Sequence, residues 1–289
     1  MAGKSPEQHD LRGMDIFDMI IHGRRFGSNG HETERSMWDR FPKLREIEKK
    51  GKFPQNVFII PDGNRRWAKK LGLDDAAGHE KGSEVIVQAF NDLSELSDHI
   101  PFVGAWGLSI DNLNRPRNEV NYLMGLFKRT IEKLRPDILK RGDRFIRIGR
   151  EDVFDGYPAV REVLEETERE TKQNSGQVIY VAVGFSGEDQ EFRMMQEFAN
   201  RIKRTPEVSI NPNFLRSFRD GNGLIPPADL VIRTSGEKRL SDLGWIAGKG
   251  TELYFTSKLF PNCGTGDFVK ALVDFSKRDR RLGKRPATS

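Results

Sequence analysis

The chain contains 289 residues, of which 36% are hydrophobic and 31% are charged, and its formal net charge at pH 7 is +5. A chain of this length can bury a full core in one large α/β domain or in two small ones. No apolar run approaches the length of a membrane span, and the modest positive charge suits an anionic substrate without requiring nucleic acid, so we expect no nucleic-acid partner.

The first 51 residues are predicted to form an N-terminal extension that is partly helical, with an amphipathic piece at 14–21 and a charged piece at 38–50. One domain is predicted over residues 52–289, because no linker or internal repeat interrupts its pattern. The first twelve residues lack the apolar core of a signal peptide. Cys263 is the only cysteine, which excludes an internal disulfide and a cysteine-based metal cluster. These features favour a cytoplasmic location, and they leave contact with a membrane surface open.

From residue 56 onward, short apolar runs alternate with longer stretches of helical periodicity. The apolar runs predict strands at 56–60, 102–108, 144–148, 178–183, 230–232 and 253–255. The periodic stretches predict helices at 82–96, 118–140, 159–173, 189–203 and 266–280. This alternation predicts an α/β fold, a single domain with a mostly parallel central sheet of about six strands covered by helices. The helix at 189–203 is expected to bury its apolar side, which carries Phe192, Met195, Phe198, Ala199 and Ile202.

The segment after the first predicted strand combines turn chemistry with phosphate-binding chemistry. Residues 61–64 read Pro-Asp-Gly-Asn, a strong turn sequence, and Arg65, Arg66 and Trp67 follow at the start of a predicted helix. A glycine turn at a helix N-terminus presents backbone N–H groups to an anion, and arginines add bidentate donors. Asp62 beside such a site makes most sense if Mg²⁺ bridges the carboxylate and a phosphate. Taken alone, the motif also fits an ordinary solvated turn.

Two further polar segments follow predicted strands. Residues 109–116 (Ser-Ile-Asp-Asn-Leu-Asn-Arg-Pro) come after the second strand, and residues 233–241 (Arg-Thr-Ser-Gly-Glu-Lys-Arg-Leu-Ser) come after the fifth. Because ligands bind at the carboxyl ends of the strands in such sheets, the three segments are expected to meet. Their arginines form two sets, which predicts two anionic groups bound at once. One set is Arg65, Arg66 and Arg115, and the other is Arg233 and Arg239.

The order and spacing of these motifs resemble those of the cis-prenyltransferase family, which includes undecaprenyl diphosphate synthase. The resemblance covers roughly residues 56–283. The matching stretches are D-G-N-R-R-W-A at 62–68, G-H at 78–79, S-I-D-N-L-N-R-P at 109–116, D-L-V-I-R-T-S-G-E-K-R-L-S-D at 229–242, G-T-E-L-Y-F at 250–255 and R-L-G at 281–283.

The resemblance implies an enzyme that condenses isopentenyl diphosphate with an allylic prenyl diphosphate to give a Z-configured polyprenyl diphosphate of short or medium length. It also implies a homodimer, and Mg²⁺ bound by Asp62 with help from Glu252. Catalytic roles are implied for Asp62, His79, Ser109 and Asn112. Substrate-binding roles are implied for Gly63, Asn64, Arg65, Arg66, Trp67, Arg115, Arg233, Arg239, Ser241, Arg281 and Gly283.

The chain departs from the family pattern mainly around the allylic diphosphate. The family's N-Y-G-G-R appears here as G-F-S-G-E at 184–188, and Asp75 replaces an arginine. The isopentenyl diphosphate motif is nearly complete at 229–242, where Asp242 stands in place of the final asparagine. Trp106 is expected to plug the product tunnel. The residues expected to line that tunnel, which equally fit an ordinary core, are Phe90, Leu93, Leu123, Met124 and Phe127. These changes predict an altered allylic substrate, product length or reaction outcome.

Two alternatives stay open. The first is an irregular synthase of the lavandulyl diphosphate type, which joins or cyclises dimethylallyl units. Retention of Arg233, Arg239 and Ser241 counts against it, because those residues match an isopentenyl diphosphate site. The second is a non-catalytic subunit of a heteromeric synthase, and retention of the Asp62 loop counts against that.

Overall fold

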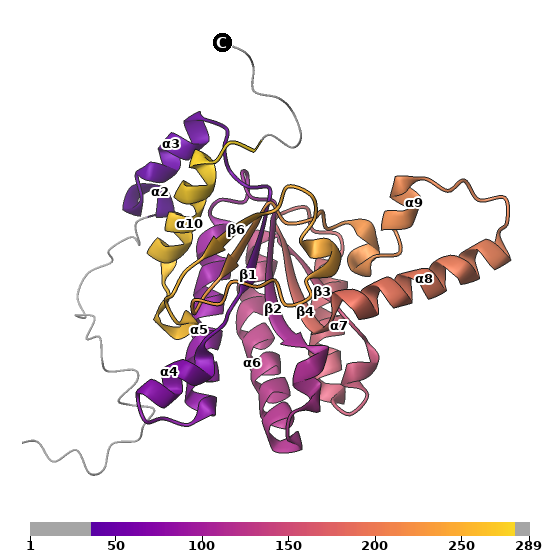
Figure 1. Ribbon diagram of the computed structural model, residues 1–289, viewed down its shortest axis with the longest axis horizontal. Helices are drawn as coiled ribbons and strands as arrows, with labels where there is room; N and C mark the ends of the chain where they lie inside the picture. Colours follow the sequence, from indigo (N-terminus) through magenta and orange to yellow (C-terminus); the bar gives the residue numbers. More distant parts are fainter. Residues whose placement is uncertain (1–35, 281–289) are drawn as a thin grey trace, which may run out of the picture. The chain divides into compact units, whose positions relative to one another are not determined.

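The computed structural model describes residues 36–280, and its centre is a six-stranded parallel sheet (Figure 1). The strand order is β3-β4-β2-β1-β5-β6, and every neighbouring pair is parallel. The strands are β1 (Asn56–Ile60), β2 (Phe102–Ser109), β3 (Arg144–Ile148), β4 (Val178–Phe185), β5 (Leu230–Arg233) and β6 (Glu252–Phe255). The predicted α/β fold is therefore confirmed, and each predicted strand is present with small shifts at its ends.

The helices connect these strands and begin close to the carboxyl edge of the sheet wherever they follow a strand. Within the described residues they are α2 (Met37–Arg40), α3 (Lys43–Lys49), α4 (Asn64–Lys70), α5 (Asp75–Ser94), α6 (Arg117–Arg141), α7 (Pro158–Thr171), α8 (Gly187–Arg204), α9 (Pro212–Arg216) and α10 (Thr265–Lys277). A short 3₁₀ helix, η1 (Ile110–Asn114), follows β2. None of the described helices combines the length and hydropathy needed to cross a bilayer.

Helix α5 begins at Asp75, well before the predicted start at residue 82. The Asp74 carboxylate caps it by accepting a hydrogen bond from the backbone N–H of Ala77. Two glycines then allow α5 to lie directly against α4. A Cβ at Gly78 would come within 2.2 Å of the carbonyl oxygen of Asn64, and one at Gly82 within 2.5 Å of its side-chain oxygen. The sequence periodicity missed this first turn because small residues, rather than large apolar ones, make its contact.

The two faces of the sheet bury separate apolar clusters, as the alternation along β1 illustrates. Val57 and Ile59 belong to one cluster, and Phe58 and Ile60 belong to the other. The first cluster includes side chains from α5, α6, α7 and α10, together with buried residues of α2 and α3. The second is closed mainly by the chain between residues 225 and 247. The predicted amphipathic piece at 14–21 lies outside the described residues.

Helix α8 projects away from the sheet (Figure 1), and its apolar side is not buried as predicted. Phe192 is 61% exposed and Met195 is 69% exposed. Phe198 makes edge contacts with Phe214 and Phe218, which come from the segment that follows α8. The prediction was wrong because an amphipathic pattern indicates that one side of a helix avoids water without identifying what covers it.

Candidate functional site

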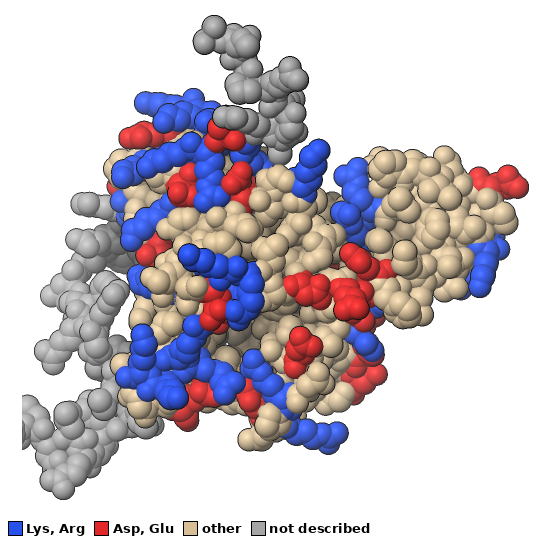
Figure 2. Space-filling view, viewed as in Figure 1, with Lys and Arg blue, Asp and Glu red and all other residues tan. Residues whose placement is uncertain are grey.

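The three predicted polar segments meet at the carboxyl edge of the sheet, where they line a cleft of about 840 Å³. Lys and Arg side chains gather over α4 and over the connection between β5 and β6, around a hollow in the surface (Figure 2). The predicted site residues that line the cleft are Asp62, Gly63, Asn64, Arg65, Arg66, His79, Ser109, Asn112, Arg115, Arg233, Arg239 and Ser241. The structure therefore brings together most of the residues that the sequence selected.

Asp62 lies at the centre of the cleft floor, between two guanidinium groups. Its Oδ1 accepts a hydrogen bond from Arg66 at 3.1 Å, and its Oδ2 accepts one from Arg233 at 3.0 Å. The Thr234 hydroxyl lies 2.9 Å from the backbone nitrogen of Asp62 and 2.7 Å from its carbonyl oxygen, which fixes the loop. Gly63 follows with φ +105°, and a Cβ there would lie 2.8 Å from the Cβ of Ser235. Only glycine fits this position without strain.

Arg233 is the most deeply buried cation of the cleft, with 4% of its side chain exposed. Besides Asp62, it donates to the Ser241 hydroxyl at 2.7 Å and to the backbone carbonyl of Arg239. Its Nε is buried without a hydrogen-bond partner among residues 36–280. A guanidinium fixed in this way presents a preorganised charge and spare donor capacity to an anion.

The other arginines of the cleft are each paired with a carboxylate. Arg65 contacts Asp75 at 2.6 Å, Arg115 contacts Glu119 at 2.9 Å, and both Arg66 and Arg239 contact Glu237. Exposed pairs of this kind are worth only about 0–1 kcal/mol. An incoming diphosphate can therefore replace the carboxylates at little cost.

One residue that lines the cleft and three that lie beside it were given no individual role in the sequence analysis. Lys69 lies one helical turn after Arg65 and Arg66 and has no hydrogen-bond partner among the described residues. Thr234, Ser235 and Glu237 belong to the matched motif and organise the arginines, since Ser235 accepts hydrogen bonds from Arg66 through its carbonyl and hydroxyl oxygens. The helical spacing of Lys69 and the position of the other three inside the motif were the available signals.

Ser109 and Asn112 are paired with each other at the rim of the cleft. The backbone N–H of Asn112 donates to the Ser109 hydroxyl, and the backbone N–H of Ser109 donates to the Asn112 side chain, both at 3.2 Å. This reciprocal capping box begins η1 and places Arg115 just beyond it. In the free protein, both side chains thus stabilise the loop that carries the arginine.

His79 and Asn64 lie where the polar cleft adjoins an apolar cavity. The Nε2 atom of His79 and the side-chain oxygen of Asn64 are buried without hydrogen-bond partners in the described part of the chain. Burial, followed by the nearby charge of Arg115, lowers the pKa of His79 below its ordinary value of 6.5. The imidazole is consequently neutral at pH 7, and two polar atoms are available at the mouth of the cavity.

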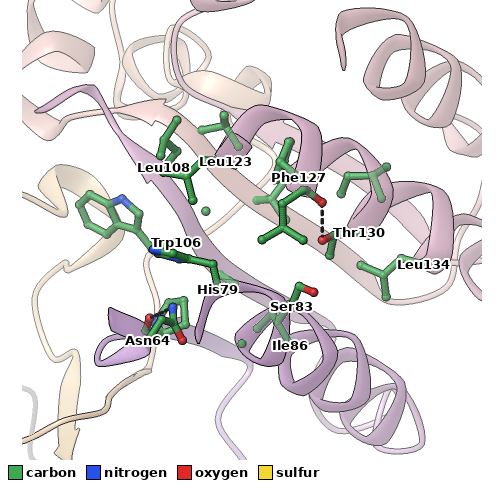
Figure 3. Close-up of a pocket in the computed structure, with 18 of the residues that line it drawn as sticks. Asn64, His79, Ser83, Ile86, Trp106, Leu108, Leu123, Phe127, Thr130 and Leu134 are labelled. Atoms are coloured by element: carbon green, nitrogen blue, oxygen red, sulfur yellow. Dashed lines mark hydrogen bonds between the residues drawn. The ribbon is translucent and has the colours of Figure 1, made fainter. Parts of the chain in front are cut away.

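The apolar cavity lies between α5, α6 and β2 and has a volume of about 120 Å³ (Figure 3). His79, Ser83 and Ile86 line it from one helix, and Leu123, Phe127, Thr130 and Leu134 line it from the other. The hydroxyls of Ser83 and Thr130 donate to backbone carbonyls of their own helices, at 2.7 Å each. The lining therefore offers an incoming chain mainly hydrocarbon.

Trp106 borders this cavity, but its ring belongs to the apolar cluster on the other face of the sheet, so the prediction that its bulk plugs the cavity was wrong. Its ring makes edge contacts with Phe58 and Phe185 in the cluster on the other face of the sheet, and Figure 3 shows it across β2 from Phe127. The position in β2 that faces Phe127 is Gly107. A Cβ at Gly107 would lie 3.3 Å from the Phe127 ring. The bulk of Trp106 thus supports the sheet instead of shortening the cavity.

Two other predicted site residues are not brought into the cleft. Trp67 donates to Asn262 at 2.7 Å and fastens α4 to the chain after β6. Glu252 lies at the amino end of β6, the opposite edge of the sheet from Asp62, and pairs with Arg278 at 2.7 Å. Arg281 and Gly283 lie outside the described residues.

The metal assignment therefore depends on Asp62 within this chain. Residues 36–280 contain no cluster of three or more His, Cys, Asp or Glu side chains that could hold a metal ion. A single carboxylate beside an anion site still suits Mg²⁺, which keeps several waters and is commonly bound through one or two carboxylates and substrate phosphates. Asp62, with 27% of its side chain exposed to the cleft, fits that arrangement.

Comparison with known proteins identifies relatives over most of the chain. Residues 60–283 match the family described as "Putative undecaprenyl diphosphate synthase". An isoprenyl transferase of Aquifex pyrophilus is 36% identical over 234 residues, which cover 81% of this chain and 97% of that protein. An isoprenyl transferase of Thermotoga maritima is 34% identical, covering 80% and 97%.

Solved structures agree with this result. Lavandulyl diphosphate synthase from Lavandula x intermedia, in complex with dimethylallyl diphosphate, superposes with a TM-score of 0.73 at 27% identity and covers 83% of this chain and all of that one. A probable undecaprenyl diphosphate synthase from Campylobacter jejuni has the same fold, with a TM-score of 0.62 at 23% identity over 80% of this chain and 99% of that one.

Proposed function

Because the chain belongs to the undecaprenyl diphosphate synthase family of isoprenyl transferases, we propose that it joins isopentenyl diphosphate to an allylic prenyl diphosphate and creates a Z double bond. Family membership makes it a prenyl-transferring enzyme, and the particular substrates are our proposal. The observation that carries it is the pair of arginine sets around Asp62, at the mouth of a cavity lined mainly by hydrocarbon. Such an arrangement suits two diphosphates and one apolar chain.

The leaving diphosphate is assigned to the N-terminus of α4, where backbone N–H groups and Arg65, Arg66 and Arg115 supply donors. Mg²⁺ would be held by Asp62 together with diphosphate oxygens, and when bound it offsets the charge that develops on the leaving group. Arg233, Arg239 and Ser241 hold the second diphosphate. The allylic C–O bond breaks, the double bond of isopentenyl diphosphate attacks the resulting cation, and loss of a proton restores a double bond.

The remaining residues of the cleft orient the reacting carbons and exclude water. Neutral His79 and the side-chain oxygen of Asn64 border the point where the cavity opens to the arginines. A neutral imidazole adds no positive charge beside a carbocation, so the lowered pKa of His79 suits its position. Holding the two substrates at reacting distance supplies a large part of the rate enhancement in a condensation of this kind.

The size of the cavity supports a short or medium product. At about 120 Å³ it is close to the roughly 150 Å³ of an engineered apolar cavity that accepts benzene, a molecule about as large as one isoprene unit. Each added five-carbon unit must therefore push side chains aside or leave the cavity. We propose Phe127, which is half buried and faces the cavity, as the residue that limits elongation.

Product analysis with Phe127→Ala tests both the reaction and the limit on chain length. The enzyme is incubated with Mg²⁺, labelled isopentenyl diphosphate and a panel of allylic diphosphates, and products are identified by mass and double-bond geometry. We expect growth in five-carbon steps with Z double bonds, and products at least one step longer from the variant. Leu139→Ala, on the exposed side of the same helix, should leave the product length unchanged. E-configured products, or no incorporation of isopentenyl diphosphate, would contradict the proposal.

A second candidate function is favoured by one observation, the 27% identity to lavandulyl diphosphate synthase. In that reading the chain couples two dimethylallyl units and releases a branched or cyclic product. The buried Arg233 with its bond to Ser241 counts against it, because those residues match the isopentenyl diphosphate motif of the elongating enzymes. In the same assay, a branched or cyclic product from dimethylallyl diphosphate alone would favour this alternative.

We also propose that the enzyme acts as a homodimer that packs through α8. On the side seen in Figure 2, the middle of the lobe formed by α8 and α9 is uncharged, and charged side chains lie at its edges. The large apolar side chains exposed there and in the adjoining chain are Phe192, Met195, Ile210, Leu215 and Leu224. Several large exposed apolar side chains on one lobe are typical of an interaction site, and a two-fold pairing would bury them against a copy of the same lobe.

The double substitution Phe192→Glu and Met195→Glu should convert a dimer into a folded monomer. Burying two carboxylates in an apolar interface costs several kcal/mol, whereas both positions are open to water in the isolated chain. Light scattering coupled to size-exclusion chromatography measures the mass. Leu71→Glu, at a residue 57% exposed after α4, is the matched control and should stay dimeric. A wild-type monomer, or a variant that remains dimeric, would contradict the assignment.

A further inference from the structure

A set of hydrogen bonds joins the first turn of α8 to the turn at residues 241–244. The Ser186 hydroxyl donates to Oδ2 of Asp242 at 2.6 Å. The backbone N–H of Gly187 donates to the Asp242 carbonyl at 3.0 Å, and the backbone N–H of Glu188 donates to its carboxylate at 3.4 Å. We call these contacts the α8 latch. They connect the N-terminus of one helix to a loop that follows the fifth strand.

The turn held by the α8 latch has a backbone conformation that its residues disfavour. The angle φ is +54° at Ser241 and +61° at Asp242, in the left-handed region that is strained for residues other than glycine. Gly187 and Gly244 touch so closely that a Cβ on either one would lie within 2.6 Å of the other's Cα. Strained turns of this kind persist only where the surroundings hold them. The latch and the contact between the two glycines supply that support.

The same turn is part of the cleft. Ser241 accepts a hydrogen bond from Arg233 at 2.7 Å, and Arg233 in turn donates to Asp62 at 3.0 Å. Asp242 itself lines the cleft. Direct contacts therefore run from Ser186 through the turn to the buried arginine and to Asp62. A turn that relaxed toward an unstrained conformation would move the Ser241 hydroxyl away from Arg233.

Both side chains of the α8 latch also stand where this sequence leaves the family pattern. Ser186 occupies the place of the first glycine in N-Y-G-G-R, and Asp242 occupies the place of the asparagine that ends R-L-S-N. Glycine has no hydroxyl to donate, so the 2.6 Å hydrogen bond depends on a serine at 186.

We propose that Ser186 and Asp242 are positioning residues for isopentenyl diphosphate. This inference rests on the proposed function, in which Arg233 and Ser241 hold that diphosphate. The α8 latch keeps the 241–244 turn in its strained form, so that the donors of Ser241 and Arg233 converge on the second diphosphate. The allylic diphosphate, bound by α4 and Arg115, does not depend on this turn.

Ser186→Ala tests the α8 latch, because it should change the KM for one substrate and not for the other. The variant should raise KM for isopentenyl diphosphate about tenfold, while KM for the allylic diphosphate and kcat stay within about twofold. Ser186→Thr keeps the hydroxyl and should restore a KM near that of the wild type. A general loss of structure would instead move both KM values together. An unchanged KM, or equal changes for both substrates, would overturn the inference.

Asp242→Gly tests the other end of the α8 latch and guards against a variant that fails to fold. Glycine permits the φ of +61° without strain, so the protein should fold, but glycine also samples other conformations and the carboxylate that fixes the turn is lost. We expect the same tenfold change, and the Ser186→Ala, Asp242→Gly double variant should be no worse than either single one. Additive effects in the double variant would argue against a shared contact.

Titration calorimetry with isopentenyl diphosphate separates this inference from the proposed function. If the wild type binds isopentenyl diphosphate but does not turn it over, the proposed reaction is wrong. The role of the α8 latch is then still tested by binding, because Ser186→Ala should bind the compound more weakly. If the wild type turns the compound over and Ser186→Ala binds it equally well, the proposed role of the α8 latch is wrong and the proposed reaction stands. No binding by the wild type would overturn both.

Discussion

Replacing Asp62 by alanine should lower kcat on the order of a thousandfold while the protein stays folded. The Asp62 carboxylate lies between Arg66 and Arg233 at the centre of the cleft, and in the proposed reaction it holds Mg²⁺ against the leaving diphosphate. Its pair with Arg66 is largely exposed and contributes little to stability, whereas loss of its pair with the buried Arg233 should lower the free energy of unfolding by about 1–3 kcal/mol. The measurement is kcat with saturating substrates, with thermal unfolding followed by circular dichroism.

Asp62→Asn separates charge from shape, since asparagine keeps one oxygen acceptor and nearly the same volume. It should be almost as inactive as Asp62→Ala, because a neutral amide binds Mg²⁺ poorly. Asp75→Asn is the matched control in the same cleft, where the carboxylate contacts Arg65 at 2.6 Å and has no proposed metal role. That control should stay within about tenfold of the wild type. Activity of Asp62→Asn in the same range would contradict the metal assignment.

The fold could be predicted because strand and helix signals in this chain are strong and local. The run Asn56–Ile60 is wholly buried in the structure, and each of its neighbours in the sheet has the same apolar character. Parallel pairing then brings the ends of β1, β2 and β5 to one edge, which is why the loop at Asp62 and the residues Ser109 and Arg233 meet. The predicted site followed from topology and from motifs, and neither required knowledge of side-chain packing.

The parts that could not be predicted depend on packing. The register of β2 shifts between Trp106 and Leu108, so strict alternation does not assign its side chains to the correct faces. Glu252 stands directly before the strand predicted at 253–255, so the topology alone placed it at the edge away from Asp62, and only the resemblance assigned it to the metal. The exposed side of α8 has the same periodicity as a buried one, and only the absence of a covering element within residues 36–280 distinguishes them.

Replacing Arg233 by lysine should raise KM for isopentenyl diphosphate about a hundredfold, a loss of roughly 2.7 kcal/mol in binding free energy. The buried guanidinium joins Asp62, Ser241 and the Arg239 carbonyl at once, and a compact ammonium group cannot span these partners. We also expect the free energy of unfolding to fall by about 1–3 kcal/mol, because the buried acceptors lose donors. Initial rates at varied isopentenyl diphosphate, together with urea unfolding, provide both values.

Arg239→Lys is the informative comparison for this prediction, because both arginines are assigned to the same diphosphate and differ mainly in burial. The Arg239 side chain is 62% exposed and pairs with Glu237 in water, whereas the Arg233 side chain is 4% exposed. Both lysine substitutions keep the positive charge of the side chain and remove the guanidinium geometry. If burial and fixed geometry make Arg233 effective, Arg239→Lys should change KM only a few-fold and leave the free energy of unfolding within about 0.5 kcal/mol of the wild type. Equal effects at the two positions would mean that charge, and not the preorganised hydrogen bonding of Arg233, governs binding of the second diphosphate.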